Sequence, residues 1–186
     1  TLESGDVVAA RDLYRALAEA CLERRDLPRA QNALSRLIET DPANLDARQR
    51  LAAVCEEQGE TERALAAYRK LAAKSSEMGD RSRALAATER LRALDPDNLD
   101  CCSDLAETYL KLDRVDEAIA QFHFLGERLL AKGQRDEGIR VNRQISLLAP
   151  DRLDCRLQVA DRYERHGLNE QAVTEYLEIA NAATAG

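Results

Sequence analysis

Two histidines are the first side chains to test for catalysis, because a hydrolase needs a nucleophile with a positioned base. His166 comes directly before Gly167 at a predicted helix end, where we expect a structural role near the last backbone carbonyls. His123 lies between Phe122 and Phe124, and both a packing role and contact with a ligand remain open for it. Two histidines offer few options for a catalytic arrangement, so we predict no catalytic residues and no enzyme activity.

Metal and cofactor sites are not predicted either. The cysteines form no CxxC pair, and neither histidine is spaced with a cysteine pair as a structural zinc site requires. The sequence has no glycine-rich phosphate loop, no HExxH motif and no calcium-binding loop. Adjacent carboxylates such as Glu56 and Glu57 are typical of a solvated helix face. We expect the cysteines to be small buried side chains in a reducing cytoplasm. They are Cys21, Cys55, Cys101, Cys102 and Cys155.

The composition is typical of a folded, helical protein. Of the 186 residues, 45% are hydrophobic and 33% are charged, while aromatic residues make up 4%. Alanine and leucine dominate the apolar set, and they favour helices because they lose little side-chain entropy there. The formal net charge of −7 argues against nucleic acid as a partner, since phosphate binding draws on clustered Lys and Arg. No apolar run approaches the roughly 20 residues that cross a bilayer, so membrane insertion is not predicted.

Composition and the chain ends indicate where the protein is located and whether the sequence is a segment. We expect a cytoplasmic protein, and the Arg- and Ala-rich composition gives it a bacterial character. The chain begins with Thr1 rather than Met and ends in the small, polar run "NAATAG". We therefore expect it to be a segment of a longer protein.

One phrase recurs at a fixed interval: "DPANLD", "DPDNLD" and "APDRLD" begin at residues 41, 95 and 149. Their prolines lie 54 residues apart, and the same offset aligns apolar positions along most of the chain. Within each aligned block the matched apolar residues are three, four or seven apart, which is the period of one helix face. Each block is therefore predicted to be an amphipathic helix. Aligned sets include Leu51, Leu105 and Val159; Ala64, Ala118 and Ala172; and Tyr68, Phe122 and Tyr176.

Ten helices and no strand are predicted. Between the helices, Pro96 ends one helix, Asn98 can cap the next, and Asp100 lies in its first turn, where the helix dipole favours an acid. Side-chain caps are also expected from Thr61, Asp80 and Asn169, and positive φ at Gly59, Gly79, Gly133 and Gly167. The predicted helices cover residues 6–24, 27–40, 44–58, 61–78, 80–94, 98–112, 115–132, 134–148, 152–166 and 169–183.

These residues resemble the tetratricopeptide repeat family. Its pattern runs from a large residue through Leu, a small residue, an aromatic and a turn glycine to alanine, a second aromatic, an apolar position and a final proline. The resemblance implies an all-α, right-handed helical-repeat solenoid of antiparallel helices, forming a single domain over residues 1–186. In one copy, Cys55 replaces the first aromatic. The copies are Leu51, Ala52, Cys55, Gly59, Ala64, Tyr68 and Leu71; Leu105, Ala106, Tyr109, Asp113, Ala118, Phe122 and Leu125; Val159, Ala160, Tyr163, Gly167, Ala172, Tyr176 and Ile179; and, without the turn glycine, Leu17, Ala18, Cys21, Ala30, Leu34, Leu37 and Pro42.

The length of the repeat departs from the family. The family repeats at about 34 residues with two helices, whereas here the unit has 54 residues and three helices. We predict units at about residues 1–43, 44–97, 98–151 and 152–186, of which the first and last are partial. An odd number of helices would put equivalent helices on opposite faces of a two-layer stack, so we expect an armadillo-like stack of three-helix units. Overlapping two-helix repeats remain the alternative, since the middle helix of each unit also fits the first half of the pattern.

The resemblance implies a non-catalytic scaffold that binds a partner protein or peptide on an extended concave surface. The register of the family places the first helix of each pair along that surface, and its positions lean acidic, so we expect a basic or amphipathic partner. The family's clamp for peptide carboxylates, which uses Lys and Asn, is not favoured. The predicted protein-binding residues are Glu19, Gln49, Glu56, Ser103, Glu107, Lys111, Asp161 and Glu164.

The sequence leaves two alternatives to the scaffold open. The first is a homo-oligomer that self-associates through exposed solenoid ends, because terminal repeats normally need a polar outer face. The last helix instead carries Val173, Tyr176, Leu177 and Ile179. The second alternative is a regulatory domain that responds to a peptide or metabolite bound in an apolar pocket near Phe122, His123 and Phe124.

Overall fold

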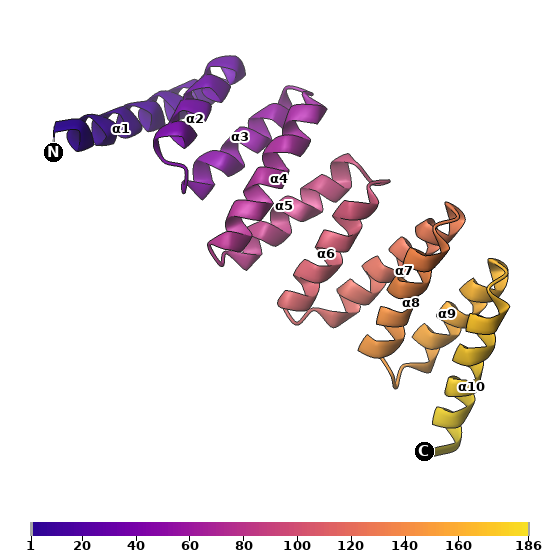
Figure 1. The fold of residues 1–186 in the computed structure, drawn as a ribbon. Coiled ribbons are helices and arrows are strands. Elements are labelled where there is room, and N and C mark those ends of the chain that lie inside the picture. The colour runs from indigo at the N-terminus through magenta and orange to yellow at the C-terminus, as the bar shows by residue number, and fades with distance from the viewer. Residues whose placement is uncertain (1, 186) are drawn as a thin grey trace. The chain divides into compact units, whose positions relative to one another are not determined.

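The computed structural model describes residues 2–185, and the side chains of residues 7–184. These residues form ten α-helices and no strand (Figure 1). The all-α helical-repeat fold is thereby confirmed. The helix bounds agree with the predicted ranges to within two residues, except that the first helix begins at residue 2 rather than residue 6. The helices are α1 (Leu2–Glu23), α2 (Leu27–Thr40), α3 (Leu45–Glu57), α4 (Thr61–Glu77), α5 (Arg81–Leu94), α6 (Leu99–Lys111), α7 (Val115–Ala131), α8 (Arg135–Leu148), α9 (Leu153–Arg165) and α10 (Asn169–Ala185).

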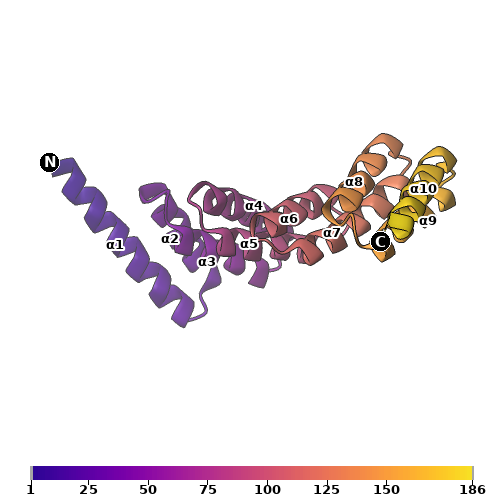
Figure 2. The ribbon, with the colours of Figure 1, turned by 90° about the horizontal axis from the view of Figure 1, so that it is seen from below.

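The chain forms two compact units, residues 1–96 with α1 to α5 and residues 97–186 with α6 to α10. Within each unit, every helix packs against the helix that follows it in the chain (Figures 1 and 2). None of the described helices is long and apolar enough to cross a membrane. A single domain built from 54-residue units stays a prediction.

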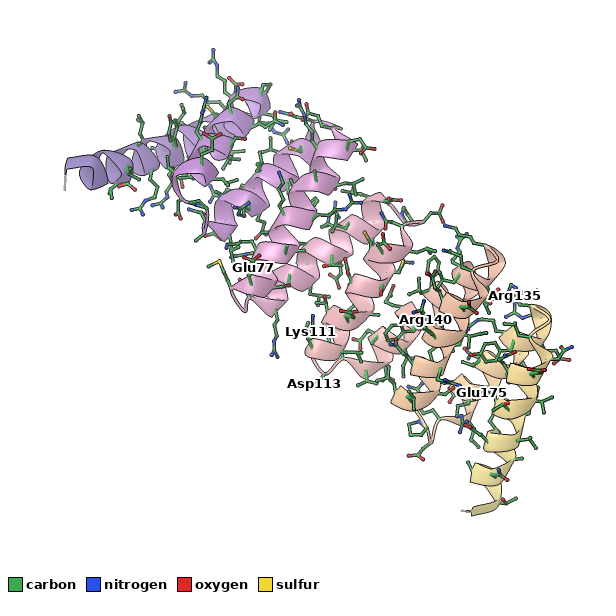
Figure 3. The ribbon with its side chains drawn as sticks, in the orientation of Figure 1. Glu77, Lys111, Asp113, Arg135, Arg140 and Glu175 are labelled. Atoms are coloured by element: carbon green, nitrogen blue, oxygen red, sulfur yellow. The ribbon has the colours of Figure 1, made fainter. Side chains whose placement is uncertain are left out.

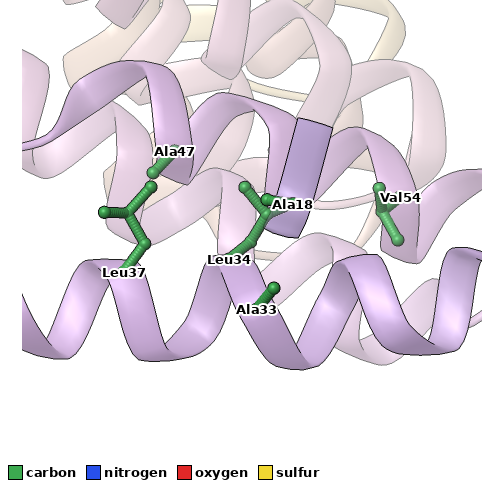
Figure 4. Packing of buried hydrophobic residues seen from close by; sticks show 6 residues of the cluster. All are labelled: Ala18, Ala33, Leu34, Leu37, Ala47 and Val54. Carbon is green, nitrogen blue, oxygen red and sulfur yellow. The ribbon is translucent and has the colours of Figure 1, made fainter. Parts of the chain in front are cut away.

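Small side chains let the helices of the first unit approach one another closely. Leu34 is only 1% exposed and lies among alanines from three helices (Figure 4). Fully burying a leucine contributes about 1.5–3 kcal/mol, so such contacts hold α1, α2 and α3 together. All five cysteines are free and buried, as predicted. The residues of this cluster are Ala18, Ala33, Leu34, Leu37, Ala47 and Val54.

The turns that end six helices contain a residue with positive φ, and these residues recur at the 54-residue interval. The four predicted glycines are confirmed, with φ between 69° and 77°. The other two are Arg25, with φ of 56°, and Asp113, with φ of 58°. The six residues form two series, 25, 79 and 133, and 59, 113 and 167.

Helix caps follow the same interval in the first part of the chain. The predicted caps Asp80 and Asn98 are confirmed, because each side chain accepts from the backbone N–H three residues later, at 3.0 and 3.2 Å. Asp26 and Asn44, 54 residues earlier, make the same contact.

The caps predicted at Thr61 and Asn169 are wrong. Both residues are the first residue of their helix, α4 and α10, rather than the residue before it. A cap must precede the helix to reach the unpaired N–H groups of its first turn, and Glu60 holds that place for α4 without a side-chain bond.

Candidate functional site

A groove built by three consecutive helices recurs in both units. In the first unit it has a volume of about 580 Å³ and lies between α3 and α5, with buried residues of α4 as its floor. In the second unit it has a volume of about 390 Å³ and lies between α6 and α8, with buried residues of α7 as its floor. Tyr68 and Leu71 of the first floor correspond to Phe122 and Leu125 of the second, 54 residues later. The two grooves therefore occupy the same place in the repeat.

The walls of the second groove follow from helical periodicity. On α6 and on α8 the lining residues are adjacent or three or four apart, so each set lies on one face of its helix. The α6 wall comprises Leu99, Asp100, Ser103, Glu107 and Leu110, and the α8 wall comprises Glu137, Arg140, Val141 and Gln144.

Two arginines span the first groove. Arg83 of α5 donates to Asp46 Oδ1 at 2.7 Å and to Gln49 Oε1 at 3.1 Å, both on α3. Two turns further along α5, Arg90 donates to the carboxylate of Glu56 at the other end of α3. These contacts connect the two walls and neutralise the carboxylates within the unit.

The second groove lacks both arginines. Among the residues that line this groove, no hydrogen bond or ion pair joins the α6 wall to the α8 wall. Arg140 is the only basic side chain in the lining, and it lies 3.8 Å from Glu137 on its own helix (Figure 3 shows Arg140). The carboxylates of Asp100, Glu107 and Glu137 give the lining an excess of negative charge. At the repeat interval, Glu137 replaces Arg83, Gln144 replaces Arg90, Glu107 replaces Ala53 and Leu110 replaces Glu56.

Four of the predicted binding residues lie at these grooves. Gln49 lines the first groove, and Ser103 and Glu107 line the second. Glu56 is not among the lining residues, but it contacts two of them, because it accepts from Arg90 and, at 2.8 Å, from the Tyr68 hydroxyl. Because Gln49 and Glu56 already bind arginines of α5, they are less open to a partner than the sequence indicates.

The other four predicted residues lie elsewhere. Glu19 lines a separate hollow of about 150 Å³ among α1, α2 and α3, and its carboxylate is 3.8 Å from Arg50. Asp161 and Glu164 on α9 both accept from the Tyr176 hydroxyl, at 2.8 and 3.2 Å. Lys111 is exposed in the last turn of α6 and is not among the residues that line the groove (Figure 3). The structure therefore does not gather the eight residues into one site, and their role in protein binding stays a prediction.

Sequence reasoning missed a buried polar network between α7, α8 and α9. Its centre is Arg162, which is 5% exposed. Its guanidinium donates to Glu127 Oε2 at 3.0 Å and to the buried Asn142, and its Nη2 lies 3.0 Å from His123 Nδ1. The repeat offered a signal, because Val54, two intervals earlier, is 3% exposed. An arginine at a repeat position where another copy buries a valine predicts a buried charge that needs hydrogen-bonding partners.

His123 is held neutral in this network. Burial, and then the charge of Arg162, lower the pKa of His123 to about 4. The neutral ring accepts from Arg162 through Nδ1, which leaves its proton on Nε2, a buried atom without a hydrogen-bond partner. Packing is therefore the role that the geometry supports for His123.

Glu127 also contacts Arg165, the last residue of α9, and His166, which follows it. Arg165 donates to Glu127 at 3.1 Å, and His166 Nε2 lies 3.3 Å from the same carboxylate. Burial raises the pKa of Glu127, but hydrogen bonds from His166, Arg162 and Arg165 together hold it below the usual value. His166 is thus structural, although its ring contacts a carboxylate rather than backbone carbonyls.

The three residues predicted to surround an apolar pocket diverge in the structure. Phe122 lies in the floor of the second groove, whereas His123 turns to Arg162. Phe124 is half-buried beside Arg128, whose guanidinium carbon is 5.3 Å from the ring centroid. Within the described part of the chain, no group of three or more His, Cys, Asp and Glu residues could hold a metal ion.

The sequence matches a family model for the tetratricopeptide repeat over residues 21–77 and 75–123, more than half of the chain. The chain belongs to the tetratricopeptide repeat family. The two matches begin 54 residues apart, at the interval that relates the two grooves. Tetratricopeptide repeat proteins are in general protein-interaction scaffolds.

Several solved structures are similar to this tetratricopeptide repeat protein. MamA from Desulfovibrio magneticus RS-1 is 15% identical, with a TM-score of 0.33, and the match covers 95% of this chain and 96% of that one. A Podosopora anserina kinesin light chain with nearly identical TPR-like repeats is 14% identical, with a TM-score of 0.45 and coverage of 97% and 96%. PilF of Pseudomonas aeruginosa is 19% identical, with a TM-score of 0.32 and coverage of 95% and 78%. The comparison with curated proteins found no match.

Proposed function

We propose that this protein is a non-catalytic scaffold that binds a partner protein or peptide in the grooves of its repeat units. The observation that carries the proposal is the recurrence of one three-helix groove at the same register in both units. Each groove combines a buried, largely apolar floor with walls that carry both polar and apolar side chains, the combination that binds a peptide through apolar anchors and orients it through polar contacts. Membership of a family of interaction scaffolds supports the same proposal.

The partner, in this proposal, is basic or amphipathic and is not a nucleic acid. Acidic side chains on an extended, concave binding surface would favour a basic segment, and electrostatic complementarity of this kind directs specificity and association rate. The net charge of −7 would repel phosphates rather than attract them.

Site-specific photo-crosslinking tests the proposal. A photoreactive residue is placed at Ala53 in one groove or at Ser103 in the other, and at least one of the two positions should form adducts with a partner in a lysate of the source organism. The same residue at the exposed Asp151, outside both grooves, is the control and should form none. Equal adducts from Asp151, or no adduct from either groove, would contradict a scaffold that uses these grooves.

Self-association is a second candidate function, favoured by apolar side chains left exposed on α1 and α10. Leu13 on α1 is 66% exposed, while Val173 and Leu177, one turn apart on α10, are 56% and 60% exposed. Tyr176 and Ile179, which were also predicted to need cover, are half-buried. Light scattering across the micromolar range tests this function, and a strict monomer at every concentration would remove it.

A further inference from the structure

The first unit contains a binding site for an arginine side chain, and its own Arg83 fills that site. The Arg83 guanidinium donates hydrogen bonds to a carboxylate oxygen of Asp46 and to the amide oxygen of Gln49, both on α3. The Arg83 side chain is 28% exposed, so the contact lies at the edge of the groove and is partly shielded from water. Charge-assisted hydrogen bonds of this kind are stronger than neutral ones and fix the orientation of the guanidinium.

The second unit keeps acceptors on that wall but has lost the arginine. Asp100 stands where the first unit has Asp46, and Ser103 stands where it has Gln49. Glu137 replaces Arg83, so the facing wall adds a carboxylate instead of supplying a cation. Neither Asp100 nor Glu107 forms an ion pair with a described residue. In the first unit, Asp46 and Gln49 bind a cation of the same chain. In the second unit, the corresponding Asp100 and Ser103 are available to a cation from a partner.

The net charge of the two units differs in the same direction. Six of the seven net negative charges of the sequence fall in residues 97–186, and one falls in residues 1–96. A basic segment is therefore attracted to the second unit before it reaches the groove.

Apolar side chains around the second groove indicate that its partner also needs apolar residues. Leu110 replaces Glu56, Leu129 replaces the buried Ser75, and Val141 replaces Ala87. Leu110 and Val141 are half-buried, and they lie on opposite walls over a floor that includes Phe122. Anchors for apolar side chains thus lie beside carboxylates, which is the pattern that an amphipathic, basic segment complements.

We propose that the groove between α6 and α8 binds a partner segment that carries an arginine or lysine beside apolar residues, and that the equivalent groove of the first unit does not. This inference rests on the proposed scaffold function and narrows it to one groove and one class of partner. The cation from the partner lies between Asp100 and Glu137, in the place that Arg83 takes in the first unit, and the apolar residues contact Leu110, Val141 and the floor. The volume of about 390 Å³ accommodates a few side chains of such a segment.

Peptide selection tests the inference without knowledge of the natural partner. A random peptide library displayed on phage is selected on the whole chain, and the enriched peptides are synthesised and titrated by fluorescence anisotropy. We expect them to carry Arg or Lys between apolar residues. Glu137→Arg, which restores the arginine of the first unit, should weaken binding by about tenfold or more, because it places a cation opposite Asp100.

Two further variants complete the test. Asp151→Arg makes the same change of charge on an exposed residue outside the groove and should leave the affinity within about twofold. Glu107→Ala introduces the residue of the first unit and should weaken binding several-fold. Circular dichroism checks that each variant stays helical, as expected for substitutions at exposed positions.

The outcomes separate this inference from the proposed function. Selected peptides that lack basic residues, or that bind wild type and Glu137→Arg equally, overturn the inference, while photo-crosslinking from a groove would still support the scaffold. Failure to select any peptide also overturns it. If, in addition, neither groove forms a photo-crosslink, the proposed function fails as well.

Discussion

At the scale of single residues, Arg162 shows what a charge inside this repeat requires. Burying an unpaired charge is costly, and the cost falls only when hydrogen-bonding partners replace the lost water. Glu127 on α7 and Asn142 on α8 are those partners, and His123 accepts the remaining contact. Burial lowers the pKa of Arg162 but leaves it a cation at neutral pH, because Glu127 opposes that shift. The network thus ties α7, α8 and α9 together through polar contacts.

The lowered pKa of His123 predicts that folding stability decreases in mild acid. Above pH 6.5 the ring is neutral in both the folded and the unfolded chain. Below pH 6.5 the unfolded chain takes up a proton that the folded chain accepts only near pH 4, so the unfolded state is favoured across this window. Because the ring is only half-buried, we expect a loss on the order of 2 kcal/mol.

Urea denaturation at several pH values between 7 and 4 measures this effect. His123→Gln cannot titrate, and the stability of wild type should fall relative to that of the variant as the pH falls. The slopes are compared rather than the absolute values, since glutamine also alters packing. Parallel curves for the two proteins would show that His123 titrates normally in the folded state.

At the scale of helices and turns, the 54-residue interval sets the backbone conformation more strictly than it sets the residue type. Asp113 adopts the same left-handed conformation as Gly59 and Gly167, 54 residues before and after it (Figure 3 shows Asp113). A non-glycine residue in this conformation is strained by about 1 kcal/mol or more, although Asp tolerates it better than most. The turn between α6 and α7 thus keeps the backbone conformation of the equivalent turns at Gly59 and Gly167 despite this strain.

Replacing Asp113 by glycine should stabilise the protein. Asp113→Gly relieves the strained φ, and the gain is partly offset by the greater freedom of glycine in the unfolded chain, so we expect about 0.5 kcal/mol. The midpoint of urea denaturation measures the change. Gly59→Asp, the reverse substitution at the equivalent turn, should destabilise by about 1 kcal/mol. If both variants shift the midpoint in the same direction, strain at this position is not the cause.

The helices could be predicted almost completely from the sequence, while the site could be predicted only in part. Apolar periodicity and the glycines at turns locate the helices because both follow from local geometry. Arg25 adopts a glycine-like conformation that its residue type does not signal. Ser103 and Glu107 were found on the α6 wall, but Glu137 on the facing wall was missed, because the register of the family directs attention to the first helix of each pair. Which carboxylates are already paired depends on contacts between helices that are distant in sequence.

At the scale of the whole molecule, the two units carry grooves at the same place in the repeat but differ in charge. Either the local chemistry of each groove or the net charge of each unit could direct a basic peptide to residues 97–186. The exchange variant Arg83→Glu with Glu137→Arg separates these causes, because it keeps the total charge at −7. It also leaves the second unit more acidic than the first.

If groove chemistry decides, the exchange should move the binding site from one unit to the other. In the variant, Asp46 and Gln49 lose their internal arginine and become open to a cation, whereas the new arginine occupies the place between Asp100 and the α8 wall. Amide chemical shifts measured with a selected peptide should then change at Gln49 and Ala53, and those at Ser103 and Glu107 should no longer respond. Should the shifts remain at Ser103 and Glu107 with unchanged affinity, net charge would be the determinant. In that case, the presence of a glutamate (Glu137) in the second unit at the position where the first unit has Arg83 would not determine specificity.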